Sequence, residues 1–268
     1  MRAKAKIRAE RIPYEVPPPG ELPGRLETVL KVVYLVFTSG YAPASGDSVV
    51  RTDLADEAIR LGRLLASLLP DPEVLGLLSL MLLQDSRRAA RTTTEGDLVL
   101  LPDQDRSLWD RARITEGAAL LERATSSGQL GPYTLQAAIA AAHAQAPTPQ
   151  ATDWGRIVGL YDLLARADPS PVVELNRAVA VSMRDGPSAG LVLIDALLER
   201  GQLTTYNLAH AARADLLRRL RRTTTAHAAY QRALELTRTE PERRFIQRRL
   251  RELARGPSDD AAVRATHP

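Results

Sequence analysis

The chain has 268 residues, a formal net charge of +4 and no cysteine, and its hydrophobic fraction of 44% compares with only 4% aromatic residues. The lack of cysteine excludes disulfides, thiolate metal sites and cysteine nucleophiles, while no apolar run reaches the roughly 18 residues of a membrane span and no signal segment is present. We therefore expect a cytoplasmic protein without membrane contact, whose core of leucine, alanine and valine favours helices.

The chain begins with a basic segment and a proline-rich linker. Residues 1–11 carry five cations and one acid, a sum of +4, and we expect them to form the end of a basic helix. Residues 12–24 follow as a linker with three consecutive prolines at 17–19. Consecutive prolines remove amide donors and favour extended geometry, so this linker is predicted to be a stiff spacer at a domain boundary.

Helix signals repeat from residue 25 to residue 255, with little room for strands. Apolar residues at helical spacing predict a first helix that stops at Gly40 and a second helix capped by Asp53. The segment Asp71-Pro72-Glu73 is predicted to open a third helix, which is apolar on nearly every side from Val74 to Leu83 and should therefore be central.

Proline marks the starts of several later helices, at positions 132, 171, 187 and 241. A proline is favourable there because the N–H groups of the first helical residues have no hydrogen-bond acceptor within the helix, so the missing N–H of proline costs nothing. The one extended candidate is residues 95–101, which we expect to form a short hairpin or an ordered loop.

The last third contains a weak internal repeat. Two sets of residues share nearly the same spacing: Ala178, Val181, Ala189, Leu193 and Ala196, then Ala214, Leu217, Ala226, Tyr230 and Ala233. Small residues at such positions let antiparallel helices approach closely, as in tetratricopeptide-like (TPR-like) repeats.

The predicted fold class is all-α: an array of antiparallel helix pairs over residues 25–255, TPR-like (an α-solenoid) in its last third. A disordered tail is predicted over residues 256–268.

Positive charge is also concentrated in residues 213–255, which contain 13 arginines and five acids. Direct nucleic-acid binding by this region is one interpretation, but the region lacks interleaved aromatic residues. Arginines on solvated helix faces are the simpler explanation.

The sequence gives no sign of catalysis. Nucleotide-binding, nucleophile-elbow and zinc-protease motifs do not occur, and the four histidines are too scattered to predict a metal site. We therefore expect no enzymatic activity, no cofactor and no metal. His143, in an alanine-rich helix, is predicted to be a partly buried, hydrogen-bonded imidazole.

Two polar segments supply candidates for a partner or ligand surface. Weaker candidates are Asn176 and Arg177, and Asp153 and Trp154 at a predicted helix start. The candidate residues are Asp85, Arg88, Asp103, Asp105, Arg106, Trp109, Asn176 and Arg177. One interpretation of residues 103–109 is a helix start with an aspartate cap and an inward tryptophan. The other joins them to Asp85 and Arg88, a carboxylate and a guanidinium that need partners at the end of an apolar helix. In that case the two segments line a polar pocket or a docking surface.

Several segments together resemble a known family. They are residues 2–8, 12–14, 32–37, 40–41, 85–91, 103–107, 131–133, 136–141 and 175–180, and the resemblance spans residues 2 to about 253. The chain resembles one group of bacterial extracytoplasmic-function (ECF) RNA polymerase sigma factors, which carry a long C-terminal TPR-like extension. Its most specific part is Asp103 to Ser107 followed by Trp109.

The resemblance implies how the whole factor would work. Such sigma factors bind core RNA polymerase and the −10 promoter element through region 2, and recognise the −35 element through a helix-turn-helix in region 4. Residues 2–11 resemble the last turns of region 4, and neither region is otherwise expected in this sequence. We expect this remnant to contact DNA phosphates at most, through Arg2, Lys4, Lys6 and Arg8. Three explanations are open for the lack of regions 2 and 4 in this sequence: a misassigned start codon, a truncated gene, or an extension that exists independently.

The resemblance and the helical array predict a C-terminal regulatory domain that acts in transcription initiation through protein contacts. RNA polymerase core and promoter DNA would be bound through regions 2 and 4, and a partner protein or the factor's own sigma regions through the array. The alternative is an independent small-molecule sensor or partner-binding TPR-like protein, with the polar residues in a closed pocket.

Overall fold

The structure is a computed structural model and describes residues 21–41 and 52–255. Its α-helices are α2 (Leu22–Tyr41), α3 (Thr52–Leu68), α4 (Pro72–Asp85), α5 (Arg111–Thr125), α6 (Pro132–Gln145), α7 (Trp154–Ala167), α8 (Pro171–Arg184), α9 (Pro187–Glu199), α10 (Asn207–Arg219), α11 (Thr223–Leu236) and α12 (Glu240–Arg255). Short 3₁₀ turns separate some of them: η2 (Arg88–Ala90), η3 (Leu101–Asp103), η4 (Arg106–Leu108) and η5 (Pro149–Ala151). The predicted basic helix, most of the predicted linker and the predicted tail lie outside the described residues, as do Arg2, Lys4, Lys6 and Arg8.

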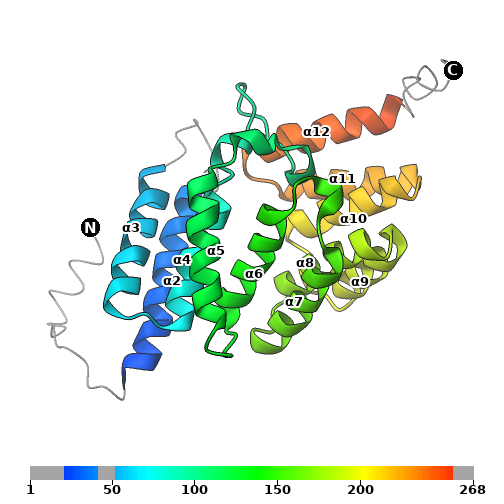
Figure 1. The fold of residues 1–268 in the computed structure, drawn as a ribbon. Helices are drawn as coiled ribbons and strands as arrows, with labels where there is room; N and C mark the ends of the chain where they lie inside the picture. The colour runs from blue at the N-terminus through cyan, green and yellow to red at the C-terminus, as the bar shows by residue number, and fades with distance from the viewer. Residues whose placement is uncertain (1–20, 42–51, 256–268) are drawn as a thin grey trace, which may run out of the picture.

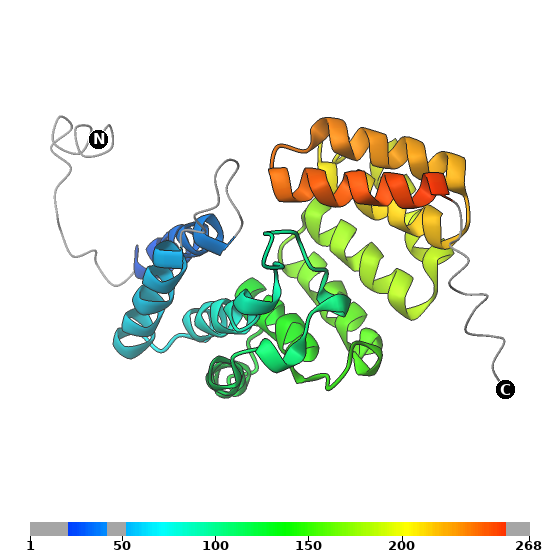
Figure 2. The same cartoon turned by 90° about the horizontal axis from the view of Figure 1, so that it is seen from above.

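The helices pack against their neighbours in the chain, as the pairs α2–α3, α4–α5, α8–α9 and α10–α11 illustrate (Figure 1). Seen from above, the helices follow one another in an arc from α2 and α3 to α11 and α12 (Figure 2). The predicted all-α class and the array of helix pairs are confirmed. Within the described residues, β pairing is limited to one antiparallel bridge between Thr92 and Leu98, and no helix there is long and apolar enough to cross a membrane.

The first two helices differ from the sequence prediction at their ends. Helix α2 continues one residue past Gly40, because the Tyr41 ring stacks on Phe37 at 5.2 Å and carries the Arg91 guanidinium 3.6 Å above it. Asp53 is not a cap: it lies in the first turn of α3, where its charge still favours the positive end of the helix dipole. Helix α2 also begins at Leu22, inside the stretch predicted as linker.

Helix α4 has the central position predicted for it. Asp71 caps it by accepting a hydrogen bond from the Glu73 N–H at 2.8 Å, and every residue from Val74 to Leu83 is buried. Helix α4 contacts α2, α3, α5 and α6. A helix surrounded in this way must be apolar on all sides.

The predicted repeat corresponds to two consecutive helix pairs. Ala178 on α8 and Ala214 on α10 are fully buried, and so are Ala226 and Ala233 on α11. Tyr230, the largest residue of the repeat, is 1% exposed and fills the core between α10, α11 and α12. Small and large residues therefore alternate as helix-pair packing requires.

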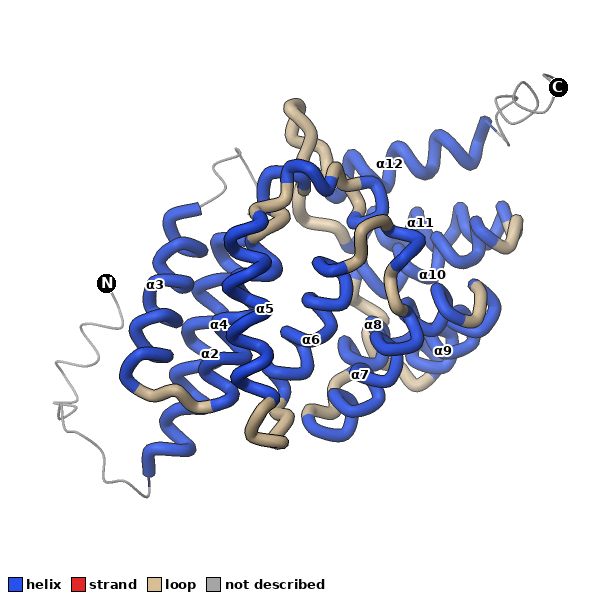
Figure 3. Tube along the Cα trace, in the orientation of Figure 1, coloured by secondary structure: helices blue, strands red, loops and turns tan. Residues whose placement is uncertain are grey.

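One long loop, residues 86–110, leaves the helical array and contacts α12 (Figure 3). The Asp97 carboxylate forms an ion pair with Arg244, whose Nε lies 2.9 Å away, and accepts a hydrogen bond from Arg248 Nη1 at 3.4 Å. Arg244 Nη2 donates to the Gly96 carbonyl at 3.0 Å. The hairpin or ordered loop predicted over residues 95–101 is thus a turn held against the C-terminal helix.

Candidate functional site

The sequence-predicted residues occupy several different environments. Asp85 and Arg88 belong to an ion cluster at the end of α4. Arg106 and Trp109 lie against the C-terminal half of α6, and Asp105 is exposed beside them. Asp103 lines a small cleft with residues of α12, and Asn176 and Arg177 are on α8. Of the eight, Arg106 and Asn176 line one groove.

Asp85 is a buried carboxylate whose partners are arginines. It is 2% exposed and forms ion pairs with Arg88, at 2.7 Å, and with Arg113. Both guanidiniums also contact Asp56, at 2.9 and 3.5 Å, and the hydrogen bond from Arg88 lowers the pKa of Asp56. Arg113 also pairs with Asp110 at 3.4 Å, so two cations and three acids compensate one another where α3, α4 and α5 meet.

The segment around Arg106 anchors the long loop to α6. The Arg106 Nη1 donates to the carbonyls of His143, at 3.0 Å, and Ala146, at 2.7 Å. These carbonyls belong to the end of a helix, where they have no intrahelical partner. The guanidinium also lies 4.4 Å from the Trp109 ring, so Arg106 closes the end of α6 and fixes the loop there.

Asp105 acts as a cap, as one interpretation of the sequence predicted, but it caps a 3₁₀ turn, and the cap of the following α-helix is Asp110, which was not predicted. Asp105 caps η4 by accepting from the Ser107 N–H at 2.9 Å and hydroxyl at 2.7 Å, and these bonds lower the pKa of its carboxyl. Asp110 caps α5. Trp109 packs inward and is 3% exposed.

A groove of about 560 Å³ runs between the long loop and helices α6, α7 and α8; we name it the inner groove. It lies beside Leu101 of the loop, Trp154 and Tyr161 of α7, and Met183 of α8. Arg106 borders it at one side and the exposed Asn176 at another. An apolar groove with a few polar groups suits either a peptide segment or a small organic ligand.

The His143 side chain lines the inner groove, and its imidazole is uncharged at neutral pH. Burial, together with the charges of Arg87 and Arg106, lowers its pKa to about 4. Its ring lies edge-on to Trp154 at 5.2 Å between centroids. Burial also raises the pKa of Tyr161 to about 12, so the two polar rings of this wall are both neutral at pH 7.

The pKa of His143 predicts an acid-sensitive fold. The unfolded chain binds a proton near pH 6.5 but the folded chain only near pH 4, so stability falls as pH drops through this interval. We expect the free energy of unfolding to be about 2 kcal/mol lower at pH 5 than at pH 7.5, measured by urea unfolding. The variant His143→Gln should lose most of this difference, and an equally steep profile in the variant would contradict the assignment.

The other charged residues predicted from the sequence are mostly paired. Arg177 Nε lies 2.5 Å from Asp162 on α7 and is not part of the inner groove. Six of the 13 arginines in residues 213–255 form ion pairs: Arg213, Arg218, Arg232, Arg244, Arg248 and Arg249. The positive charge of this region is therefore partly neutralised within the fold.

Sequence reasoning missed most of the inner groove. Trp154, one of the weaker sequence candidates, does line the groove, but Tyr161 and Met183 come from two different helices and belong to no recognisable motif. The pairing of Asp97 with α12 joins residues about 150 positions apart, which no local pattern signals. Among the described residues, no group of three or more histidines or acids is placed to hold a metal ion.

Comparison with known proteins finds relatives of unknown function. Residues 25–125 match the model of a family of unknown function, DUF6596. The chain is 47% identical over 258 residues to the uncharacterized protein R00370 of Rhizobium meliloti (strain 1021). This match covers 96% of the chain and 60% of the relative, so the chain spans about three fifths of that protein's length. No solved structure matches.

Proposed function

We propose that the chain is the C-terminal, TPR-like regulatory domain of an ECF-type RNA polymerase sigma factor. It would act in the cytoplasm through protein contacts rather than catalysis, while regions 2 and 4 of the whole factor bind polymerase and promoter DNA. The resemblance of the sequence to that group supports this proposal. So does the length of the rhizobial relative, of which 40% lies outside the match and leaves room for such regions.

One observation carries the proposal. Arg106, in the most specific part of the resemblance, borders the inner groove and fixes the loop that forms one of its walls. A helical array binds partners along its concave side, and the long loop lies on the inner side of the arc (Figure 2). We infer that the inner groove holds a segment of a partner protein or of the factor's own sigma regions.

Filling the groove should impair transcription without unfolding the domain. Asn176 is exposed at the rim, so Asn176→Arg should place a long cation in the groove at little cost in stability. We expect reporter transcription directed by the whole factor to fall more than tenfold, with an unchanged melting temperature. The control Val192→Arg changes a residue of α9 that is 68% exposed and lies outside the groove, and it should retain full transcription.

Arg106→Ala tests the same proposal through the loop. Removing the guanidinium leaves the end of α6 uncapped, so hydrogen exchange in residues 99–110 should accelerate and transcription should fall. If both Asn176→Arg and Arg106→Ala fold and transcribe normally, the inner groove has no part in transcription. An immunoblot of native cells gives an independent check: a band larger than 29.3 kDa would agree with a complete sigma factor.

The second candidate function is a small-molecule sensor, and the size of the inner groove favours it. About 560 Å³ falls within the range of roughly 300–1,000 Å³ that is typical of ligand sites. A metabolite that binds the folded state alone must raise the melting temperature. A thermal-shift screen therefore distinguishes the two: a hit that Asn176→Arg abolishes supports the sensor, and its absence leaves the protein-binding role.

A further inference from the structure

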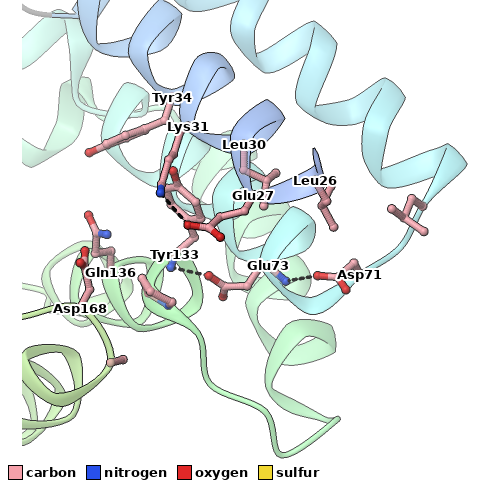
Figure 4. Close-up of a pocket in the computed structure, with 13 residues that line it drawn as sticks. Leu26, Glu27, Leu30, Lys31, Tyr34, Asp71, Glu73, Tyr133, Gln136 and Asp168 are labelled. Carbon is pink, nitrogen blue, oxygen red and sulfur yellow. Dashed lines mark hydrogen bonds and ion pairs between the residues drawn. The ribbon is translucent and has the colours of Figure 1, made fainter. Parts of the chain in front are cut away.

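A second groove lies at the other end of the array, between α2, the starts of α4 and α6, and the end of α7 (Figure 4). We name it the N-terminal groove; its volume is about 710 Å³. Leu26, Leu30 and Tyr34 of α2 form one apolar wall, and Tyr133 of α6 lies opposite them. None of these residues belongs to the sequence-predicted site.

The rim of this groove is acidic. Its described lining contains four carboxylates, of Glu27, Asp71, Glu73 and Asp168, against one cation, Lys31, which gives a net charge of −3. Lys31 Nζ lies 2.6 Å from the Glu27 carboxylate. An apolar groove with an acidic rim favours a ligand that is apolar in part and positively charged.

The four carboxylates differ in how far hydrogen bonds and helix dipoles within the protein already compensate their negative charge. Glu73 accepts from the N–H groups of Tyr133, at 2.8 Å, and Thr134, at 3.0 Å, at the positive end of α6, and Asp71 caps α4. Asp168 instead follows the last residue of α7, where the negative end of the helix dipole adds to its charge. The side of the groove near Asp168 therefore attracts cations most strongly.

The pKa of Tyr133 in the groove reflects this negative field. Burial raises the pKa of Tyr133 to about 12, and the nearby Tyr34 hydroxyl and the carboxylates of Glu73, Asp168 and Glu27 contribute to the rise. Acids of α2 and α4 and the acid that follows α7 thus act on one point inside the groove, although Glu27 and Asp168 are far apart in the chain.

We propose that the N-terminal groove binds the chain's own basic segment, residues 2–11. This segment alternates cations with apolar residues from Arg2 to Ala9 and includes Ile7. Its five cations and one acid complement the acidic rim, and its alanines and isoleucine complement the apolar wall. The groove and the segment therefore match in both charge and hydrophobicity.

The stretch of chain between the basic segment and the N-terminal groove is short enough to keep the segment close to the groove. Residues 12–20 join the segment to Glu21, where the described chain begins, and Leu26 of the groove follows five residues later. Nine residues in polyproline geometry span about 28 Å at roughly 3.1 Å each. The segment therefore stays within about 28 Å of Glu21, beside the part of α2 that lines the groove.

This contact does not depend on the proposed transcriptional role. Should residues 2–11 end region 4, as the resemblance implies, their docking would hold that region beside α2 and α6. The test below measures only the contact, so its failure would leave the reporter experiments on the inner groove unaffected.

Cysteine cross-linking of the full chain tests the proposal, because the natural sequence contains no cysteine. Ala167 is exposed and lines the groove at the end of α7. In the double variant Ala5→Cys/Ala167→Cys, mild oxidation should form an intramolecular disulfide, which requires Cα atoms within about 7 Å. The matched control is Ala5→Cys/Thr28→Cys, since Thr28 is exposed on α2 close to the tether but outside the groove.

We expect the Ala167 pair to cross-link at least tenfold faster than the Thr28 pair, and 0.5 M NaCl should slow it because salt screens exposed charges. Equal rates for the two pairs would overturn the proposal. Disulfide-linked dimers as the main product would also overturn it, since they would show that the segment binds a second copy.

A charge variant keeps the test informative if the cysteines disturb the fold. Glu27→Gln/Asp168→Asn reduces the net charge of the lining from −3 to −1, whereas Glu57→Gln/Asp185→Asn removes two exposed carboxylates elsewhere. Trypsin cleavage after Lys6 and Arg8, followed by mass spectrometry, should be several-fold faster in the first variant than in the second. Identical cleavage rates would contradict docking of the segment.

Discussion

Replacing Asp85 with asparagine is expected to lower the free energy of unfolding by about 3 kcal/mol, because the change removes the buried carboxylate from two ion pairs at once. Asp85 is 2% exposed and pairs with both Arg88 and Arg113, which keep only their more exposed contacts, with Asp56 and, for Arg113, Asp110, when Asp85 is lost. Asparagine keeps the shape of the side chain but removes its charge. Urea unfolding monitored by circular dichroism measures the effect.

The control for Asp85→Asn is Glu57→Gln, which removes the charge of an exposed pair with Arg60. Exposed pairs of this kind contribute about 0.5 kcal/mol or less. Equal losses for the two variants would mean that the cluster at the end of α4 is no more important than a surface pair. Because Asp85 is also a predicted site residue, this comparison separates its structural role from a functional one.

Replacing Gly76 with alanine is expected to destabilise the protein by at least about 2 kcal/mol, because overpacking a close helix contact forces the backbones apart. A Cβ atom at this position would lie 2.7 Å from the backbone nitrogen of Thr134 and 2.8 Å from its Cα. Helices α4 and α6 can therefore approach this closely only with glycine at position 76. Thermal unfolding should show the loss directly.

Gly159→Ala provides the matched control for this substitution. Gly159 is also inside a helix, but a Cβ atom there would meet nothing within 4 Å. Alanine should stabilise that helix by up to about 1 kcal/mol, because glycine loses more backbone entropy on folding. If both variants are stabilised, α4 and α6 are not in close contact at Gly76.

The sequence by itself determined the elements that depend on near neighbours. The Asp71 cap of α4, the helix starts at Pro132, Pro171 and Pro187, and the paired helices of the last third all follow from residues a few positions apart. Capping and amphipathic periodicity act within one or two helical turns, so they can be recognised without a structure. The Asp105 cap and the buried Trp109 belong to the same class.

Local signals were less reliable at helix ends. Gly40 and Asp53 have the residue types that end and cap helices, yet α2 continues past the first and α3 begins before the second. Tertiary contacts decide such cases, as the stacking of Tyr41 between Phe37 and Arg91 illustrates.

Only the tertiary structure decided which polar residues lie together. It separated Asp85 from Arg106, two residues that sequence reasoning had joined, and placed each among partners that it needs for folding. It also created both grooves from segments far apart in the chain, as with Glu27 and Asp168, which both line the N-terminal groove. The physical reason is that a groove depends on the relative positions of packed helices, and those positions are set by long-range contacts that leave no periodic pattern in the sequence.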